Sequence, residues 1–195
     1  MNIEELQEKF CEDLNGRVTT ISSSPKYNLI ITFQCNDWDN SGALRHFNII
    51  CKDVIESDIQ PTALERIYLT DTHPLLWNHN EKNGCLYYSS ELKNKYETLG
   101  RLWEVHENMY QGWRRLTDHV NIQSTEPLNY CSGTYGLLAK GPEHILKQYQ
   151  NTVTDCVQTN YVPSSKAPEK VFKILLLDNY YVICKSVNVA EYQQA

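Results

Sequence analysis

The sequence has 195 residues, of which 41% are hydrophobic and 22% are charged, and its formal net charge is -6 at pH 7. This length and composition are typical of a globular chain and exclude the disordered class. An acidic chain repels phosphate backbones unless its basic residues cluster. Arg114-Arg115 is the only tight basic pair, so we expect no nucleic-acid partner.

Seven cysteines are spread along the chain, and no two of them form a Cys-x-x-Cys pair. A dispersed, odd set indicates reduced, mostly buried thiols in a reducing compartment. The segment Met1–Glu5 is acidic and lacks the basic-then-apolar pattern of a signal peptide. No apolar stretch approaches the ~20 residues that a membrane helix needs. We therefore expect a cytoplasmic protein that does not cross a membrane.

The first half of the chain predicts one short helix followed by strands. Apolar residues at helical spacing predict a helix over Ile3–Leu14, which Asn15-Gly16 would end. Stretches rich in β-branched and aromatic residues predict strands over Val18–Ser22, Tyr27–Cys35, Leu44–Ile55 and Leu64–Leu69. The dipeptide Asn83-Gly84 favours a type I′ turn, so we expect a hairpin of Leu75–Asn80 and Cys85–Ser89.

A long amphipathic helix is predicted from Ser90 to Val120, because apolar residues recur there in steps of three and four. Gly100 and Gly112 lie inside it, and each costs about 1 kcal/mol relative to Ala. A kink or close packing near Gly112 is therefore expected.

The last third predicts strands over Tyr135–Ala139 and Cys156–Val162, with a helix from Gly141-Pro142 to Asn151 between them. Asp178-Asn179 would join Val171–Leu177 to Tyr180–Val187 in a hairpin, and Ala190–Ala195 is expected to fray. The fold class is α+β, with a curved, mostly antiparallel sheet of hairpins packed on one long helix and two shorter helices. We expect one domain over residues 1–195, with a weak possible subdivision near residues 123–132.

His106 is the leading candidate for a functional residue, because it lies within the apolar stripe of the predicted long helix, between Trp103 and Tyr110. A polar ring in such a place needs a hydrogen-bond partner. The favoured interpretation is a core histidine whose need for a hydrogen bond is satisfied within the fold. The alternative is a histidine that lines a pocket as a general base or ligand contact.

Other patterns predict less. Asp37–Gly42 begins like a calcium loop but lacks the closing Glu, so a hairpin turn is favoured. His73 and His79 would be ~20 Å apart on an unbroken strand, too far to share a metal ion. Cys131 is a weak candidate nucleophile, since no approaching His can be identified. We expect no metal and no cofactor.

The aromatic composition favours binding, because thirteen Tyr and four Trp outnumber four Phe and carry polar groups suited to interfaces and pockets. The leading hypothesis is a non-catalytic ligand-binding or protein-interaction domain. Its expected binding residues are Trp77, Trp103, His106, Tyr110, Trp113 and Arg115. The alternative is a small enzyme with His106 as general base in a pocket between the long helix and the sheet. A homo-oligomer is a third interpretation, and the partner, small molecule or protein, stays open.

Overall fold

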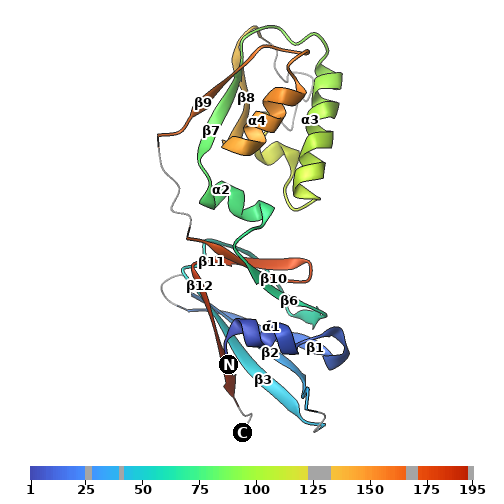
Figure 1. Cartoon of the computed structure of the whole chain (residues 1–195), viewed down its shortest axis with the longest axis vertical. Coiled ribbons are helices and arrows are strands. Elements are labelled where there is room, and N and C mark those ends of the chain that lie inside the picture. The colour runs from blue at the N-terminus through green and yellow to red at the C-terminus, as the bar shows by residue number, and fades with distance from the viewer. Residues whose placement is uncertain (25–27, 40–41, 123–132, 166–170, 193–195) are drawn as a thin grey trace. The chain divides into compact units, whose positions relative to one another are not determined.

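A computed structural model of the chain describes residues 1–24, 28–39, 42–122, 133–165 and 171–192 (Figure 1). In this part of the chain it contains four α-helices and three antiparallel sheets, which confirms the α+β class. The chain forms two compact units, Met1–Leu76 with Val171–Ala195 (unit 1) and Trp77–Lys170 (unit 2). The expected subdivision near 123–132 lies outside the described residues, and the single domain over 1–195 stays a prediction.

Unit 1 contains a five-stranded antiparallel sheet with the strand order β12-β3-β2-β1-β5. Its strands are β1 (Gly16–Ser24), β2 (Asn28–Asn36), β3 (Leu44–Lys52), β5 (Thr62–Leu64) and β12 (Ser186–Tyr192). Alternate residues of β2, among them Ile31 and Phe33, are completely buried. This alternation shows that one face of the sheet supplies the core of unit 1.

Unit 1 also contains a four-stranded antiparallel sheet with the order β4-β11-β10-β6. Its strands are β4 (Glu56–Asp58), β6 (Ile67–Thr70), β10 (Lys173–Leu177) and β11 (Tyr180–Cys184). Helix α1 (Ile3–Lys9) begins with a capping box, in which Asn2 accepts the Glu5 N–H at 2.7 Å and Glu5 accepts the Asn2 N–H at 3.2 Å. The helix buries Ile3 and Leu6 in the same core as the strands.

Unit 2 combines a three-stranded antiparallel sheet with helices (Figure 1). The sheet order is β8-β7-β9, with β7 at Asn83–Tyr88, β8 at Gly136–Pro142 and β9 at Thr159–Pro163. The helices are α2 (Trp77–Asn80), α3 (Lys95–Tyr110) and α4 (Glu143–Thr152). Leu86 of β7, Leu102 of α3 and Tyr149 of α4 are completely buried in one core.

The predicted hairpin around Asn83-Gly84 is wrong. Pro74 begins a 3₁₀ turn that ends at Leu76, and helix α2 follows directly. Leu75 and Leu76 are both buried, a pattern that does not fit a strand with only one buried face. Asn83 and Gly84 are instead the first two residues of β7. The turn dipeptide therefore starts a strand.

The predicted helix Ser90–Val120 is shorter in the structure. Asn94 caps the start of α3 by accepting the Glu97 N–H at 3.2 Å. Gln111 ends it in the left-handed conformation, with φ 50°, and Gly112 follows with φ 84°. Gly112 therefore belongs to the helix stop. Beyond it, Val120 bridges Ala139 at the edge of β8.

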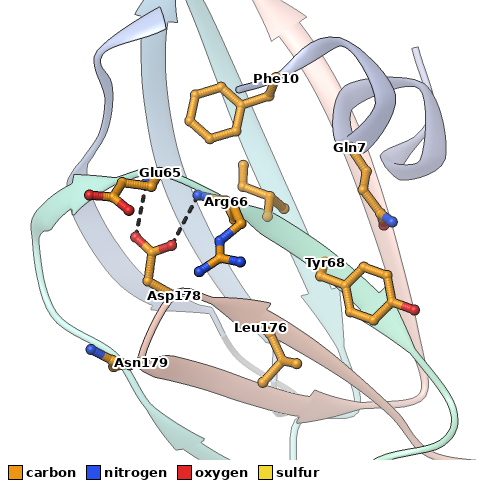
Figure 2. A pocket seen from close by; sticks show the side chains of 9 residues that line it. Gln7, Phe10, Glu65, Arg66, Tyr68, Leu176, Asp178 and Asn179 are labelled. Atoms are coloured by element: carbon orange, nitrogen blue, oxygen red, sulfur yellow. Dashed lines mark hydrogen bonds between the residues drawn. The ribbon is translucent and has the colours of Figure 1, made fainter. Parts of the chain in front are cut away.

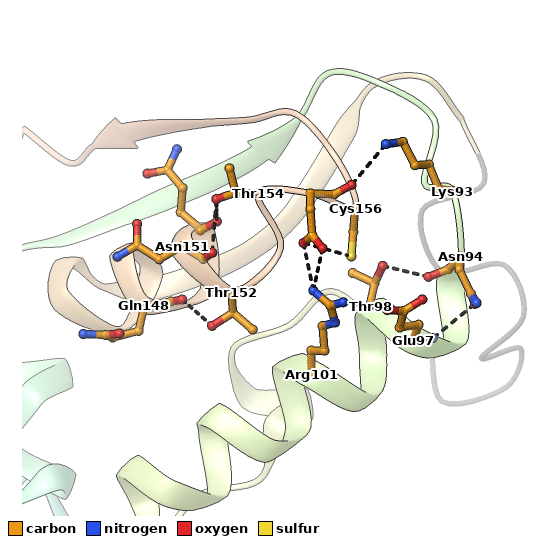
Figure 3. A network of polar contacts seen from close by, with 12 residues as sticks. Lys93, Asn94, Glu97, Thr98, Arg101, Gln148, Asn151, Thr152, Thr154 and Cys156 are labelled. Carbon is orange, nitrogen blue, oxygen red and sulfur yellow. Dashed lines mark hydrogen bonds and ion pairs between the residues drawn. The ribbon is translucent and has the colours of Figure 1, made fainter.

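Polar contacts fasten α3 to the turn that follows α4 (Figure 3). Arg101 of α3 donates to Asp155 at 2.8 Å and to Glu97, one helical turn away, at 2.6 Å. Lys93 donates to the Asp155 carbonyl at 3.2 Å. These groups are largely exposed, so their contribution to stability is modest.

The C-terminal hairpin is confirmed, since β10 and β11 pair from Lys173↔Cys184 to Leu177↔Tyr180 around Asp178-Asn179. The expected fraying from Ala190 is wrong as far as Tyr192, because β12 pairs with β3 up to Tyr192↔His46. Among the described residues, no helix has both the length and the apolar character that crossing a membrane requires.

Candidate functional site

The six predicted binding residues all belong to unit 2, and the structure brings three of them together. The Trp77 and Tyr110 rings lie 5.3 Å apart, and the His106 and Tyr110 rings lie 4.8 Å apart, between centroids. Trp103 is 58% exposed, although it lies one helical turn from His106. Arg115 is exposed and Trp113 is half-buried.

His106 is completely buried, and both ring nitrogens are hydrogen-bonded. Its Nε2 lies 2.9 Å from the Arg114 carbonyl oxygen, which can only accept, so Nε2 carries the proton. Its Nδ1 therefore accepts the hydrogen bond of the Tyr149 hydroxyl at 2.6 Å. No ring nitrogen of His106 remains available to a ligand in this arrangement.

His106 belongs to a buried group of four rings, which we call the His–Tyr cluster (His106, Tyr110, His119 and Tyr149). The His119 ring stacks on Tyr110, with centroids 5.2 Å apart and an interplanar angle of 18°. Burial raises the pKa of both tyrosine hydroxyls. Burial also lowers the pKa of His119, so this imidazole is neutral at pH 7.

His119 is the member of the cluster with an uncommitted nitrogen. Its Nδ1 lies 3.1 Å from the Lys140 carbonyl oxygen and therefore carries the proton. Its Nε2 is a buried acceptor without a hydrogen-bond partner among the described residues. Gly141 makes room for the ring, because a Cβ at that position would lie 2.5 Å from His119 Nδ1.

His119 also lines a cavity of about 680 Å³ in unit 2. Its walls come from α2, the start of β7, the end of β8 and the end of β9 with the residues that follow. Polar side chains on these walls include Asn78, Asn83, Asp118 and Lys140. Asp118 accepts the Arg115 backbone N–H at 3.1 Å. Lys140 is an exposed residue that lines the cavity, and among the described ion pairs none involves its ammonium.

A second cavity, of about 630 Å³, lies in unit 1 (Figure 2). Two of its polar side chains are already used by the fold. The Asp178 carboxylate accepts the backbone N–H groups of Glu65 at 2.9 Å and Arg66 at 3.0 Å. Gln7 accepts the Leu69 N–H at 3.1 Å. This cavity is the weaker candidate, because these hydrogen bonds fix strands and turns. His106 lines neither cavity.

The sequence interpretation missed a carboxylate–histidine pair on unit 2. Glu81 Oε2 lies 2.5 Å from His144 Nδ1, and the Trp77 ring packs edge-on against His144 with centroids 4.2 Å apart. Trp77 and Glu81 are four residues apart at α2, so the helix brings them to one side. The pair was missed because a strand, not a helix, was predicted over Leu75–Asn80. Neither Glu81 nor His144 lines either of the two cavities.

The described residues contain no group of three or more His, Cys, Asp or Glu that could hold a metal ion. Asp37 and Asp39 of the calcium-like segment instead bind Arg45, at 2.6 Å and 2.8 Å. Cys131 lies outside the described residues.

His119 itself carries no clear signal in the sequence, because it lies beyond the true end of α3, where the helical spacing has no meaning. Gly141, which makes room for the His119 ring, points to this site only when the position of β8 beside His119 is already known. No protein-family model, no curated protein and no solved structure matches this chain significantly.

Proposed function

We propose that the protein is a non-catalytic binding protein whose small-molecule site is the cavity of unit 2 beside His119. The observation that carries this proposal is a buried, neutral imidazole with an unpartnered Nε2, on a residue that lines that cavity. Buried acceptors normally have a partner, because an unsatisfied one costs about 1–3 kcal/mol. A volume of about 680 Å³ also lies within the usual range for ligand pockets.

The lining groups specify the chemistry of the ligand. Because His119 holds its proton on Nδ1, its Nε2 can only accept a hydrogen bond, so a ligand group that reaches this atom must be an N–H or O–H donor. The positive charge of Lys140, a lining residue, favours an anionic group on the ligand. A small carboxylate that also carries a hydrogen-bond donor meets both requirements.

The alternative, an enzyme with His106 as general base, has less support. A general base must reach the proton that it removes, and His106 is buried with both nitrogens hydrogen-bonded. We also propose the cytoplasm as the compartment and no nucleic acid as partner. The six described cysteines are all free thiols, and the net charge of -6 disfavours phosphate backbones.

The proposal is tested by titrating the full chain with a library of fragment-sized hydroxy- and amino-carboxylates, followed by ¹H–¹⁵N NMR. We expect shifts concentrated at Asn83–Cys85, His119 and Lys140–Gly141, the segments that line the cavity. Lys140→Ala should weaken binding roughly tenfold, as for one lost charge-assisted hydrogen bond. The matched control is Lys95→Ala, which removes a lysine from α3 that does not line the cavity.

Two results would contradict the proposal. One is a library in which no compound shifts the cavity signals. The other is binding that Lys140→Ala and Lys95→Ala weaken equally, because the charge would then act from a distance and not at the cavity.

A further inference from the structure

Two cysteines from different sheets meet in the core of unit 1. Cys51 lies in β3 of the five-stranded sheet, and Cys184 is the last residue of β11 in the four-stranded sheet. Both are free thiols, and both side chains are completely buried in one core cluster. The Lys185 N–H donates to the Lys52 carbonyl at 3.0 Å, which holds the residues after the two cysteines side by side.

The two thiols interact directly and differ in character. The two side chains lie close enough that each changes the pKa of the other, and the backbone of Ser186 also acts on the Cys184 thiol. Lys173 is the cross-strand partner of Cys184 and adds a positive charge nearby. These neighbours lower the pKa of Cys184, whereas the Cys184 sulfur, together with burial, raises the pKa of Cys51. Cys184 is therefore the better nucleophile of the pair.

We infer that Cys51 and Cys184 are a redox-active pair that closes to an intramolecular disulfide when a hydroperoxide oxidises unit 1. The Cys184 thiolate attacks the terminal oxygen of the hydroperoxide, the O–O bond breaks, and an alcohol, or water from hydrogen peroxide, leaves. Cys184 is then a sulfenic acid. The Cys51 sulfur attacks the Cys184 sulfur, the S–S bond forms and water leaves. The two thiols lose two electrons, and the hydroperoxide gains them.

The disulfide would join β3 to β11 and so fasten the two sheets of unit 1 to each other. Access to the buried sulfurs requires a local opening, and β12 provides the natural place. This strand starts two residues after Cys184 and, among the described strands, is an edge strand that pairs with β3 alone. Edge elements open at lower free energy than central ones, so the reaction should be limited by this opening.

Cys35 supplies the matched control, because it is also completely buried in this core cluster. Burial raises the pKa of Cys35 to about 11, so its thiol is protonated and unreactive at neutral pH. The thiol that acts on Cys35 is Cys11, which is exposed, so within the described part of the chain Cys35 has no buried thiol partner like the Cys51–Cys184 pair.

The test treats the reduced full chain with hydrogen peroxide, alkylates the remaining thiols in denaturant and maps the peptides by mass spectrometry. We expect a Cys51–Cys184 cross-link that dithiothreitol removes. Cys51→Ser and Cys184→Ser should lose the cross-link, and Cys35→Ser should keep it. The inference fails if Cys51 and Cys184 are both alkylated while the exposed Cys11 is oxidised, or if either forms its cross-link with a different cysteine. The wild-type map decides this even if a serine variant folds poorly.

Discussion

His106 holds three segments of unit 2 together through its two ring nitrogens. Its Nδ1 accepts from Tyr149 of α4, and its Nε2 donates to the Arg114 carbonyl beyond the end of α3. The His106 ring is completely buried, and the bond to Tyr149 is buried too, so a lost partner there leaves a polar group without water. The His106 side chain therefore stabilises unit 2 both by filling the core and by hydrogen bonding.

We expect His106→Ala to lower the free energy of unfolding by about 2–4 kcal/mol, because it leaves a cavity and orphans the Tyr149 hydroxyl. Urea unfolding followed by circular dichroism measures this loss. Trp103→Ala, on the exposed side of the same helix, should cost under about 1 kcal/mol. Equal losses in the two variants would show that the hydrogen bonds of His106 do not stabilise unit 2.

His119 should make stability depend on pH. Its pKa is lowered in the folded state, chiefly by burial, from the ordinary value of 6.5. Above that pH both states are neutral and nothing is lost. Below it the unfolded chain takes up a proton that the folded chain resists, so stability falls from about pH 6.5 down to the lowered folded pKa.

The measurement is the melting temperature of wild type and His119→Gln between pH 8 and 5. Wild type should lose more stability than the variant below about pH 6.5. Burial also lowers the pKa of His73, but that residue is present in both proteins and cancels in the comparison. If the melting temperatures of the two proteins fall in parallel with pH, the pKa of His119 is the same in the folded and unfolded states, and the prediction is wrong.

Two glycines of unit 2 should respond to alanine in opposite directions. A Cβ at Gly84 would lie 2.4 Å from the Tyr161 ring and 2.8 Å from the Val162 carbonyl oxygen, a backbone atom of the adjoining strand β9. A Cβ at Gly100, inside α3, meets nothing within 4 Å. Strand β7 therefore needs its glycine, whereas α3 does not.

We expect Gly84→Ala to destabilise the protein by about 1–3 kcal/mol through overpacking. Gly100→Ala should stabilise it by up to ~1 kcal/mol, since Ala is the better helix former. Denaturant midpoints of the two variants against wild type give both values. A stable Gly84→Ala would show that β9 can move away from β7 at little cost.

The elements that could be predicted from the sequence are those whose local signals agree with their packing. Asp178-Asn179 joins β10 to β11 as the sequence predicted, and Asp178 adopts φ 53° in this turn. Asn83-Gly84 has equally good turn chemistry, but Gly84 serves the close approach of Tyr161. Single-sequence patterns cannot separate these two uses of glycine, because one depends on a strand more than seventy residues away.

The candidate site was predictable only where it lies on a regular helix. Helical spacing grouped His106 and Tyr110 correctly, since both lie on the buried side of α3. His119 and the cavity depend on the edge pairing of Val120 with Ala139 and on Gly141 beside the ring. Those contacts join segments about twenty residues apart in the chain, and no periodic pattern of apolar residues links the two segments in the sequence.

The two units differ in charge and in how the chain forms them. Unit 1 holds eight basic and fourteen acidic residues, and unit 2 holds ten of each, so the net charge of -6 resides in unit 1. Unit 2 is one continuous segment, Trp77–Lys170, with its own core. Unit 1 needs both ends of the chain, because β10 and β11 separate β4 from β6.

We expect a fragment of residues 77–170 to fold alone and a fragment of residues 1–76 to fail. The shorter N-terminal fragment lacks β10, β11 and β12, so β4 and β6 have no sheet neighbours. Circular dichroism melts and NMR dispersion of the two fragments are the measurements. A cooperative melt of 1–76 would show that the five-stranded sheet suffices without its companion.

Strands β6 and β10 pair directly, with Thr70 opposite Ile174, although unit 2 lies between them in the chain. Unit 2 is therefore an insertion into unit 1, and the two strands that flank it in the chain, β6 and β10, are neighbours in the four-stranded sheet. Excision of residues 77–170 would need only a short Gly-Ser bridge to turn β6 and β10 into an ordinary hairpin. A different domain inserted at the same junction should be tolerated, because unit 1 would fold independently of the sequence placed between β6 and β10.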